Sequence, residues 1–312
     1  ISIGKKEDLI TLVNHLKIIV KKKSKIMIKE ITIIGPGLIG SSLGLAIKKN
    51  RIAKKIIGID KNKKNLFDAL ENKSIDFGFQ EIDNKISDSD IFFLCSPVGD
   101  FENILLELEP YIKKGAIITD VGSVKNIFNN SISRRIKKIV DIVPGHPIAG
   151  TEFSGAKNAK KELFINKWCI LTPESKKKST MIIKKLWENI GMKVSIMKAD
   201  EHDKVMSITS HLPHLIAFTI VGSALNYSPK KKKQLLNFSA GGFKDFTRIA
   251  SSDPKMWKDI FITNRKNIIK TVDIFINNLN SFKSLIEEEN TLKIMKFIKE
   301  SKKIRKDIVK LK

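Results

Sequence analysis

The stretch ITIIGPGLIGSSLG, residues 31–44, decides the fold of this chain. It opens with a short apolar run typical of a buried strand, and its glycines follow in the spacing G-x-G-x-x-G. The spacing alone is a weak signal. With a strand before it and a helix after it, however, it predicts a dinucleotide-binding turn, in which free N–H groups at the helix start hold phosphates. We therefore expect the cofactor to contact Gly35, Gly37, Leu38, Ile39 and Gly40.

A carboxylate follows at the position that distinguishes the two nicotinamide cofactors. Asp60 stands twenty residues beyond Gly40, at the end of a second expected strand, KIIGID (55–60). A carboxylate there accepts hydrogen bonds from ribose hydroxyls and repels a 2′-phosphate. The sequence therefore predicts NAD in preference to NADP, even though three lysines within residues 61–64 are able to hold a phosphate.

Strand and helix patterns alternate through the first two thirds of the chain. Strands are expected at 31–35, 55–60, 91–95, 116–122, 138–143, 168–173 and 193–197, with helices at 65–73, 101–112 and 179–190. This order predicts a Rossmann-like α/β domain with a parallel sheet over residues 27–198. After residue 198 the apolar residues recur only at helical spacing, so an all-helical domain is expected over residues 199–312. Residues 1–26 are expected to form a separate extension.

The helical part contains an unusually long apolar stripe. Asp253 and Pro254 mark a helix start, with Asp as the N-cap and Pro as the first helical residue. Apolar side chains then recur at helical spacing as far as Ile286. A helix of that length usually needs a second apolar surface to cover it. We therefore expect one long helix that forms a subunit interface in a homodimer.

Composition limits the classes of function. The net charge is +25, but the lysines are scattered and are not joined to stacking aromatic residues, so a solvated surface is expected and nucleic acid is not expected as a partner. The apolar runs 91–95 and 215–225 are shorter than the ~18–20 residues of a membrane span. No secretory signal pattern opens the sequence. We expect a cytoplasmic protein that does not enter a membrane.

Polar residues lie where the expected strands end, which is the edge at which such sheets bind ligands. Ser96 and Pro97 follow one strand, where they either approach the nicotinamide or form an ordinary loop. Ser123 follows the next strand, as a substrate contact or as a helix N-cap. His146, within PGHPIAGTE (144–152), is expected to be a general base, because a neutral imidazole accepts protons near pH 7. The alternative is a turn histidine bonded to the backbone.

The helical part adds histidines and cations. His211 and His214 are three residues apart and therefore share one helical face. No carboxylate or cysteine at suitable spacing completes a metal site, so none is expected. Lys244 and Arg248, four residues apart if the segment is helical, are expected to bind a ligand with more than one carboxylate, or else form a solvated pair.

Seven motifs together resemble the prephenate/arogenate (cyclohexadienyl) dehydrogenases of tyrosine biosynthesis. In chain order they read GPGLIGSSLGLAI, LCSPV, TDVGSVK, PGHPIAGTEFSGA, WCILTP, SHLPHLIA and GGFKDFTRIASSDPKMW. The similarity runs from about Lys29 to the C-terminus. It implies a Rossmann domain and a helical dimerisation domain with the active site between them, and NAD-dependent oxidative decarboxylation of prephenate, of arogenate, or of both.

The resemblance also implies roles for individual residues. His146 removes the proton of the substrate ring hydroxyl during hydride transfer, and Ser123 bonds that hydroxyl or orients the histidine. Arg248 holds one of the substrate carboxylates. The substrate pocket is lined by the residues that match family positions, namely His214, Thr151, Glu152, Lys244 and Asp245.

Two other functions share this architecture, and one segment lies outside it. A β-hydroxyacid or imine reductase has the same two domains, and an NAD-sensing binding protein would use the cofactor only as a signal. Residues 1–22 resemble the C-terminal tail of a histidinol-phosphate or aromatic aminotransferase. They suggest a fused aminotransferase–dehydrogenase or the tail of an upstream reading frame.

Overall fold

A parallel six-stranded sheet forms the centre of the first domain. The computed structural model describes residues 27–151, 153–174, 177–227 and 232–310, so the aminotransferase-like segment and Glu152 lie outside the described residues. The strands are β1 (Ile28–Ile34), β2 (Ala53–Ile59), β3 (Phe77–Phe79), β4 (Ile91–Leu94), β5 (Ile117–Asp120) and β6 (Asp141–Val143). Their order, β3-β2-β1-β4-β5-β6, is that of the dinucleotide-binding Rossmann fold. The expected fold class is confirmed.

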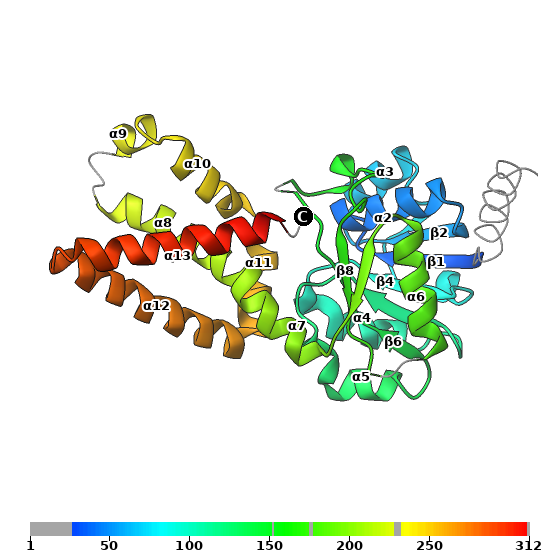
Figure 1. Cartoon of the computed structure of the whole chain (residues 1–312). Helices are drawn as coiled ribbons and strands as arrows, with labels where there is room; N and C mark the ends of the chain where they lie inside the picture. The colour runs from blue at the N-terminus through cyan, green and yellow to red at the C-terminus, as the bar shows by residue number, and fades with distance from the viewer. Residues whose placement is uncertain (1–26, 152, 175–176, 228–231, 311–312) are drawn as a thin grey trace, which may run out of the picture.

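Helices cover both faces of this sheet (Figure 1). On one face lie α2 (Leu38–Lys49), α3 (Lys63–Glu71) and α6 (Lys178–Asn189), and on the other α4 (Phe101–Leu108) and α5 (Ser131–Ile136). Because successive strand residues point to opposite faces, Phe93 packs with Trp187 of α6, whereas its neighbour Phe92 packs in the cluster of Phe101. Because both faces of the sheet are buried under helices, almost every position of the strand sequences is apolar.

A second, three-stranded sheet carries His146. Its strands are β7 (Gly145–Pro147), β8 (Trp168–Leu171) and β9 (Lys193–Ile196), with β7 antiparallel to β8 and β8 parallel to β9. The sequence predicted β8 and β9 but no strand within residues 144–152. The turn, considered above as the alternative for His146, is not what the structure has at Gly145–Pro147: these residues pair with β8 as a short strand, which a stretch of two residues between Pro144 and Pro147 cannot show by periodicity.

The rest of the chain is helical. The elements are α7 (Ala199–Met206), a π-helical turn (Ser207–His211), α8 (Leu212–Tyr227), α9 (Lys232–Asn237), α10 (Gly241–Thr247), a 3₁₀ turn (Arg248–Ser251), α11 (Pro254–Thr263), α12 (Arg265–Glu287) and α13 (Thr291–Lys310). The predicted cap is confirmed, since the Asp253 side chain accepts a hydrogen bond from the Met256 N–H at 2.8 Å. The single long helix was wrong: the stripe is divided between α11 and α12 at Asn264, whose φ and ψ are −99° and 20°.

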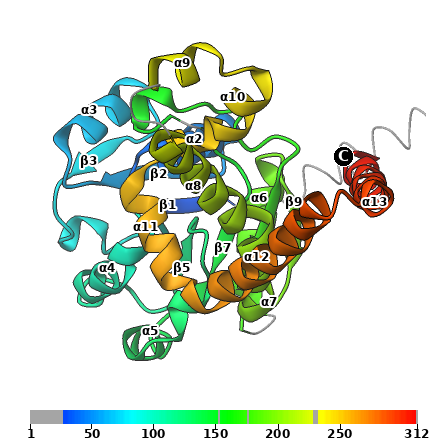
Figure 2. The ribbon, with the colours of Figure 1, turned by 90° about the vertical axis from the view of Figure 1, so that its left-hand side faces the viewer.

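Much of the apolar surface of the helical domain is exposed to solvent in the single chain. Figure 2 shows α13 standing apart from α8, which it overlaps in Figure 1. Exposed apolar side chains on α12 and α13 include Ile276, Leu279, Leu292, Met295 and Ile304. The continuous helical stretch Ala199–Ala224 has the length and hydropathy of a bilayer span, which no single apolar run in the sequence indicated. Its first half, however, holds the buried residues His202, Asp203 and His211 against the Rossmann domain.

Candidate functional site

The glycine-rich turn after β1 has room and free N–H groups for a phosphate. Gly35 has φ +85°, and a Cβ there would lie 2.8 Å from the Ser96 backbone nitrogen. A Cβ on Gly40 would lie 2.5 Å from the Gly35 carbonyl oxygen, whereas nothing lies within 4 Å of a Cβ on Gly37. α2 begins at Leu38 without a side-chain cap or an acidic residue in its first turn. This cradle fits a dinucleotide pyrophosphate.

The other predicted cofactor residues surround this turn. Leu38 is buried and Ile39 packs against the core, so their backbone N–H groups, and not their side chains, are placed to meet a phosphate. Asp60 follows β2, and its carboxylate accepts hydrogen bonds from the Asn62 N–H at 2.8 Å and from Asn65 Nδ2 at 2.9 Å. These bonds fix the direction of the carboxylate. Ser96 and Pro97 follow β4, beside β1, where the strand order reverses.

His146 is the first member of a chain of buried polar groups. Its Nδ1 lies 2.8 Å from His202 Nε2, and His202 Nδ1 lies 2.8 Å from Asp203 Oδ1. A carboxylate only accepts hydrogen bonds, so the proton of neutral His202 is on Nδ1 and its Nε2 is an acceptor. His146 must then donate from Nδ1. This assignment leaves the lone pair of His146 Nε2 free to accept a proton.

The surroundings keep this base neutral. Burial is the main cause that holds the pKa of His146 well below its ordinary value, and the neighbouring His202, Lys125 and His211 lower it further. Burial also lowers the pKa of His202, against the opposing effect of its bond to Asp203. Both imidazoles are therefore neutral near pH 7. His146 is 8% exposed, so it retains a narrow opening to the solvent side.

A buried ion pair holds the strand that carries His146. Lys125 Nζ bonds both Asp120 and the Gly145 carbonyl oxygen, while Asp120 Oδ1 accepts the Gly145 N–H at 3.0 Å. The Lys125 backbone N–H donates to Asp203 Oδ1 at 2.8 Å, the atom that also holds His202. One segment thus fixes both ends of the histidine chain.

Sequence reasoning missed these supporting residues, namely Asp120, Lys125, His202 and Asp203. Asp120 and Lys125 stand inside TDVGSVK, of which only Ser123 was singled out, and His202–Asp203 is a His-Asp pair just after the domain boundary. A buried Asp at a strand end and a Lys five residues later were the available signal, but nothing in the sequence pairs them with His146.

A second group of side chains faces the Rossmann domain from the helices. The His214 ring stacks on Trp257 with centroids 3.8 Å apart, and the His211 ring meets the same indole edge-on at 6.1 Å. The expectation that the two histidines share a face is therefore confirmed. Burial lowers the pKa of His214, the backbone of Ser210 opposes this, and the nearby Arg248 guanidinium adds to the lowering. His214 and Arg248 lie on elements that pack together, since α8 contacts the 3₁₀ turn that begins at Arg248.

The structure gathers only some of the predicted substrate residues. Ser123 is half-buried, and its backbone lies beside the His211 ring. Thr151 is exposed and accepts a hydrogen bond from the Phe153 N–H at 3.2 Å. Lys244 and Asp245 are exposed on α10, which packs against α8. α10 ends at Thr247 and Arg248 begins the following 3₁₀ turn, but with φ −52° and ψ −41° Arg248 still has α-helical dihedrals, so the four-residue spacing from Lys244 stays within one helical segment.

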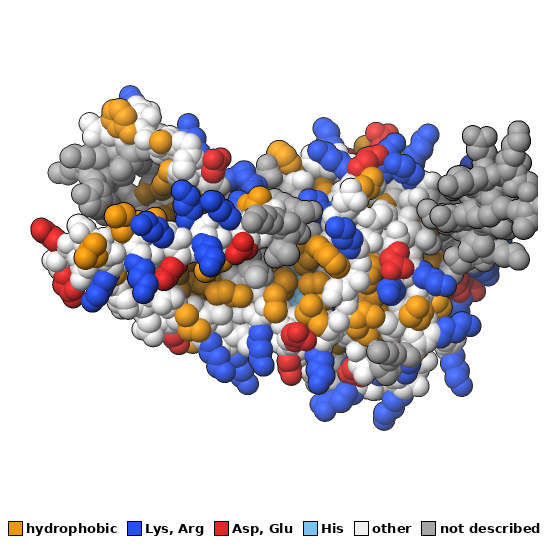
Figure 3. Space-filling model, viewed as in Figure 1, with side chains coloured by type: hydrophobic (Ala, Val, Ile, Leu, Met, Phe, Trp, Pro, Cys, Tyr) orange, Lys and Arg blue, Asp and Glu red, His pale blue; other side chains and the backbone are white. Residues whose placement is uncertain are grey.

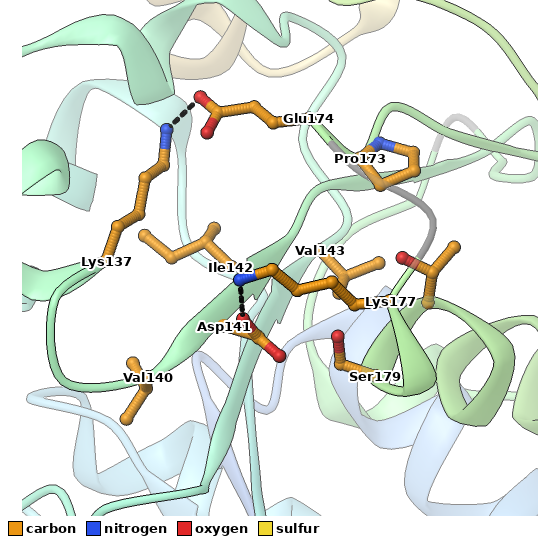
Figure 4. A pocket seen from close by; sticks show the side chains of 10 residues that line it. Lys137, Val140, Asp141, Ile142, Val143, Pro173, Glu174, Lys177 and Ser179 are labelled. Carbon is orange, nitrogen blue, oxygen red and sulfur yellow. Dashed lines mark hydrogen bonds and ion pairs between the residues drawn. The ribbon is translucent and has the colours of Figure 1, made fainter.

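A separate hollow lies at the edge strand β6 (Figure 4). Two lysines reach into it, and each is already paired: Lys177 with Asp141 at 2.6 Å, and Lys137 with Glu174. Among the described lining residues, the charges of these two pairs cancel and leave no excess positive charge for an anion. The hollow is distinct from the cluster around His146.

Comparisons with known proteins match both domains. The prephenate dehydrogenase nucleotide-binding domain matches residues 43–196, and the prephenate dehydrogenase dimerization domain matches residues 198–300. The cyclohexadienyl dehydrogenase of Zymomonas mobilis is 34% identical over 89% of this chain and 95% of its own length. The prephenate dehydrogenase of Bacillus subtilis is 34% identical over 88% of this chain and 75% of its own length.

A solved structure shows the same arrangement of both domains. It is that of prephenate dehydrogenase from Aquifex aeolicus in complex with hydroxyphenyl propionate and NAD⁺. The two chains are 36% identical, with a TM-score of 0.82, over 90% of this chain and 98% of the other.

Proposed function

Because this chain belongs to the prephenate dehydrogenase family, we propose that it oxidises and decarboxylates prephenate to 4-hydroxyphenylpyruvate, with NAD as the hydride acceptor. The observation that supports the proposal is the hydrogen-bonded chain His146–His202–Asp203 between the two domains, in which neutral His146 carries its proton on Nδ1 and leaves Nε2 unprotonated. Of the three functions considered from the sequence, the family assignment favours this one.

The glycine-rich turn supplies the cofactor site in this proposal. Backbone N–H groups at the start of α2 would hold the pyrophosphate, the Asp60 carboxylate would accept the ribose hydroxyls, and Ser96 and Pro97 would border the nicotinamide. When bound, NAD supplies the acceptor for a hydride. The two asparagines that fix Asp60 favour NAD over NADP, because a carboxylate held in place repels a 2′-phosphate.

His146 acts as the base in this reaction. Its Nε2 takes the proton of the C4 hydroxyl as hydride leaves C4, so that C4 becomes a carbonyl carbon. The bond between C1 and its carboxylate then breaks and carbon dioxide leaves. The bonding electrons move through the ring to the C4 oxygen, which takes a proton back and becomes the phenol hydroxyl of the aromatic product. The imidazolium formed at His146 is stabilised through His202 by the Asp203 carboxylate, whose pKa stays below its ordinary value because bonds from His202 and two backbone N–H groups outweigh burial.

The helical domain would bind the substrate. Arg248, whose 3₁₀ turn contacts α8, is proposed to hold a substrate carboxylate, and Ser123 to bond the C4 hydroxyl or orient His146. Lys244, Asp245 and Thr151 are exposed in one protomer, so they would complete the pocket only when substrate or another subunit covers them. Glu152 lies outside the described residues and stays a predicted pocket residue.

We further propose that the protein is a homodimer joined through α8, α12 and α13. α8 is mostly apolar and has no distinct polar face, and such a helix is usually buried. Apolar side chains of α12 and α13 are exposed in the single protomer, between lysines and arginines that spread over the visible surface (Figure 3). A second copy would cover this surface. The cytoplasmic location stays a prediction.

The test is NADH formation by the purified protein. Prephenate and arogenate should be offered separately, each with NAD and with NADP. We expect turnover with prephenate and NAD, and the arogenate rate will show whether the site accepts an amino group in place of the keto group. No turnover with either substrate under either cofactor would refute the proposal.

A further inference from the structure

The break between α11 and α12 contacts the histidine cluster directly. Asn264 ends α11, where its N–H donates to the Ile260 carbonyl at 3.0 Å, and begins α12, where its carbonyl accepts the Ile268 N–H at 3.1 Å. The side chain is only 4% exposed. Ending one helix and starting another requires only the backbone of Asn264, so its buried side-chain amide must have another role.

The Asn264 amide makes two donor bonds of different kinds. Nδ2 donates to the Asp203 carbonyl oxygen at 2.8 Å and lies 3.1 Å from His211 Nδ1. Its Oδ1 accepts a bond from Asn267 Nδ2 at 2.7 Å. A carbonyl oxygen cannot donate, so the amide cannot be turned over without placing Oδ1 against the Asp203 carbonyl. Both hydrogens of the amide group are therefore used.

These bonds determine where the proton of His211 lies. Burial lowers the pKa of His211 to about 4, so the ring is neutral near pH 7. Since Nδ1 accepts from Asn264, the single proton is on Nε2. His211 is fully buried and, among the described residues, Nε2 has no hydrogen-bond partner. The backbone of Ser123 lies beside this ring.

We propose that Asn264 is a positioning residue that holds the two buried histidines of the helical domain in the arrangement that the base requires. Its bond to the Asp203 main chain fixes the residue that orients His202, and its bond to His211 directs an N–H group towards the Ser123 side of the site. The assignment rests on the proposed function, in which His146 is the base. In this proposal the residue that positions His202 and His211 lies at the start of α12, the helix whose apolar side chains are exposed in the single chain.

The test uses Asn264→Asp, which keeps the shape of the side chain but has no N–H group. We expect kcat for prephenate to fall at least ~10-fold, as for a misplaced catalytic group, with NAD affinity unchanged. The ¹⁵N signals of His211 should show its proton moved from Nε2 to Nδ1, where it bonds the new carboxylate. Asn189→Asp, the same change at an exposed position of α6 in the Rossmann domain, is the matched control and should leave kcat and the His211 signals unchanged.

Two results would overturn the assignment. One is an unchanged His211 proton position in folded Asn264→Asp, and the other is a changed proton position with kcat within threefold of the wild type. If Asn264→Asp does not fold, Asn264→Ser, which donates one bond in place of two, is judged by kcat alone, and a value within threefold of the wild type overturns the assignment. Full activity of His146→Asn would instead refute the proposed function, so the two failures are distinguishable.

Discussion

The substitution Asp203→Asn tests most directly the hydrogen-bonded relay His146–His202–Asp203, in which His146 is the proposed base. Asp203 faces three donors and no acceptor: Oδ1 holds His202 Nδ1 and the Lys125 N–H, and Oδ2 holds the Asn126 N–H at 3.0 Å. An amide must turn its NH₂ group towards one of these donors. If NH₂ faces Asn126, the relay keeps its protons in place but loses the negative charge that stabilises the imidazolium.

If NH₂ faces His202, the relay is reversed. His202 then carries its proton on Nε2 and donates to His146 Nδ1, so the proton of His146 moves to Nε2 and blocks the base. In serine proteases the corresponding Asp→Asn change costs about 10⁴ in kcat through the wrong tautomer. Because one orientation here preserves the tautomer, we expect a loss of ~10²–10⁴, equivalent to about 2.7–5.4 kcal/mol of barrier.

The assay is the initial rate of NADH formation at saturating prephenate and NAD. Asp200→Asn, an exposed carboxylate of the same helix, is the matched control and should keep the wild-type kcat. NAD affinity and the unfolding temperature should be measured for both variants, so that a folding defect is not taken for a catalytic one. A folded Asp203→Asn enzyme with more than a third of wild-type kcat would refute the relay.

Further outcomes are expected elsewhere in the molecule. His146→Asn should lower kcat ~10²–10⁴-fold and leave NAD affinity intact, which isothermal titration can verify. In the wild type, kcat/KM should stay level as the pH falls through 6.5 and drop only below it, because burial keeps the His146 pKa well below that value; a midpoint at or above 6.5 would contradict this. Lys125→Met leaves Asp120 buried without its cation and should cost about 3–5 kcal/mol of stability in urea unfolding. Burial raises the pKa of Asp120, so the unfolded chain loses the Asp120 proton at a lower pH than the folded chain does. The loss of unfolding free energy in Lys125→Met should therefore grow from pH 5 to pH 8. Adding Asp120→Asn to the same chain should recover part of that loss. Leu279→Lys should shift the protein from dimer to monomer in light scattering, and an unchanged mass would argue against the α12 interface.

The sequence predicted most of the fold because local signals carry it. The turn at Gly35–Gly40, the strands on either side of it and the Asp253 cap each depend on residues within a few positions of one another. A six-stranded Rossmann order then follows from right-handed crossovers and adjacent connections. The helix break at Asn264 was not predicted. The apolar stripe keeps its helical spacing across this one residue, so the spacing cannot show that the helix ends there or that a buried amide is needed.

The site shows the same contrast between residues that local sequence signals identify and contacts that only tertiary packing creates. His146 and Ser123 could be singled out because each follows an expected strand, and that rule concerns one stretch of chain at a time. The pairing of His146 with His202, 56 residues later, and of Asp203 with the Lys125 backbone, 78 residues earlier, had no signal in the sequence. Those contacts arise only when the helical domain packs on the strand ends. The sequence thus singled out His146 as the candidate base. The tertiary structure decided which nitrogen of this residue carries its proton, because a proton position depends on the partners that packing brings within hydrogen-bond distance.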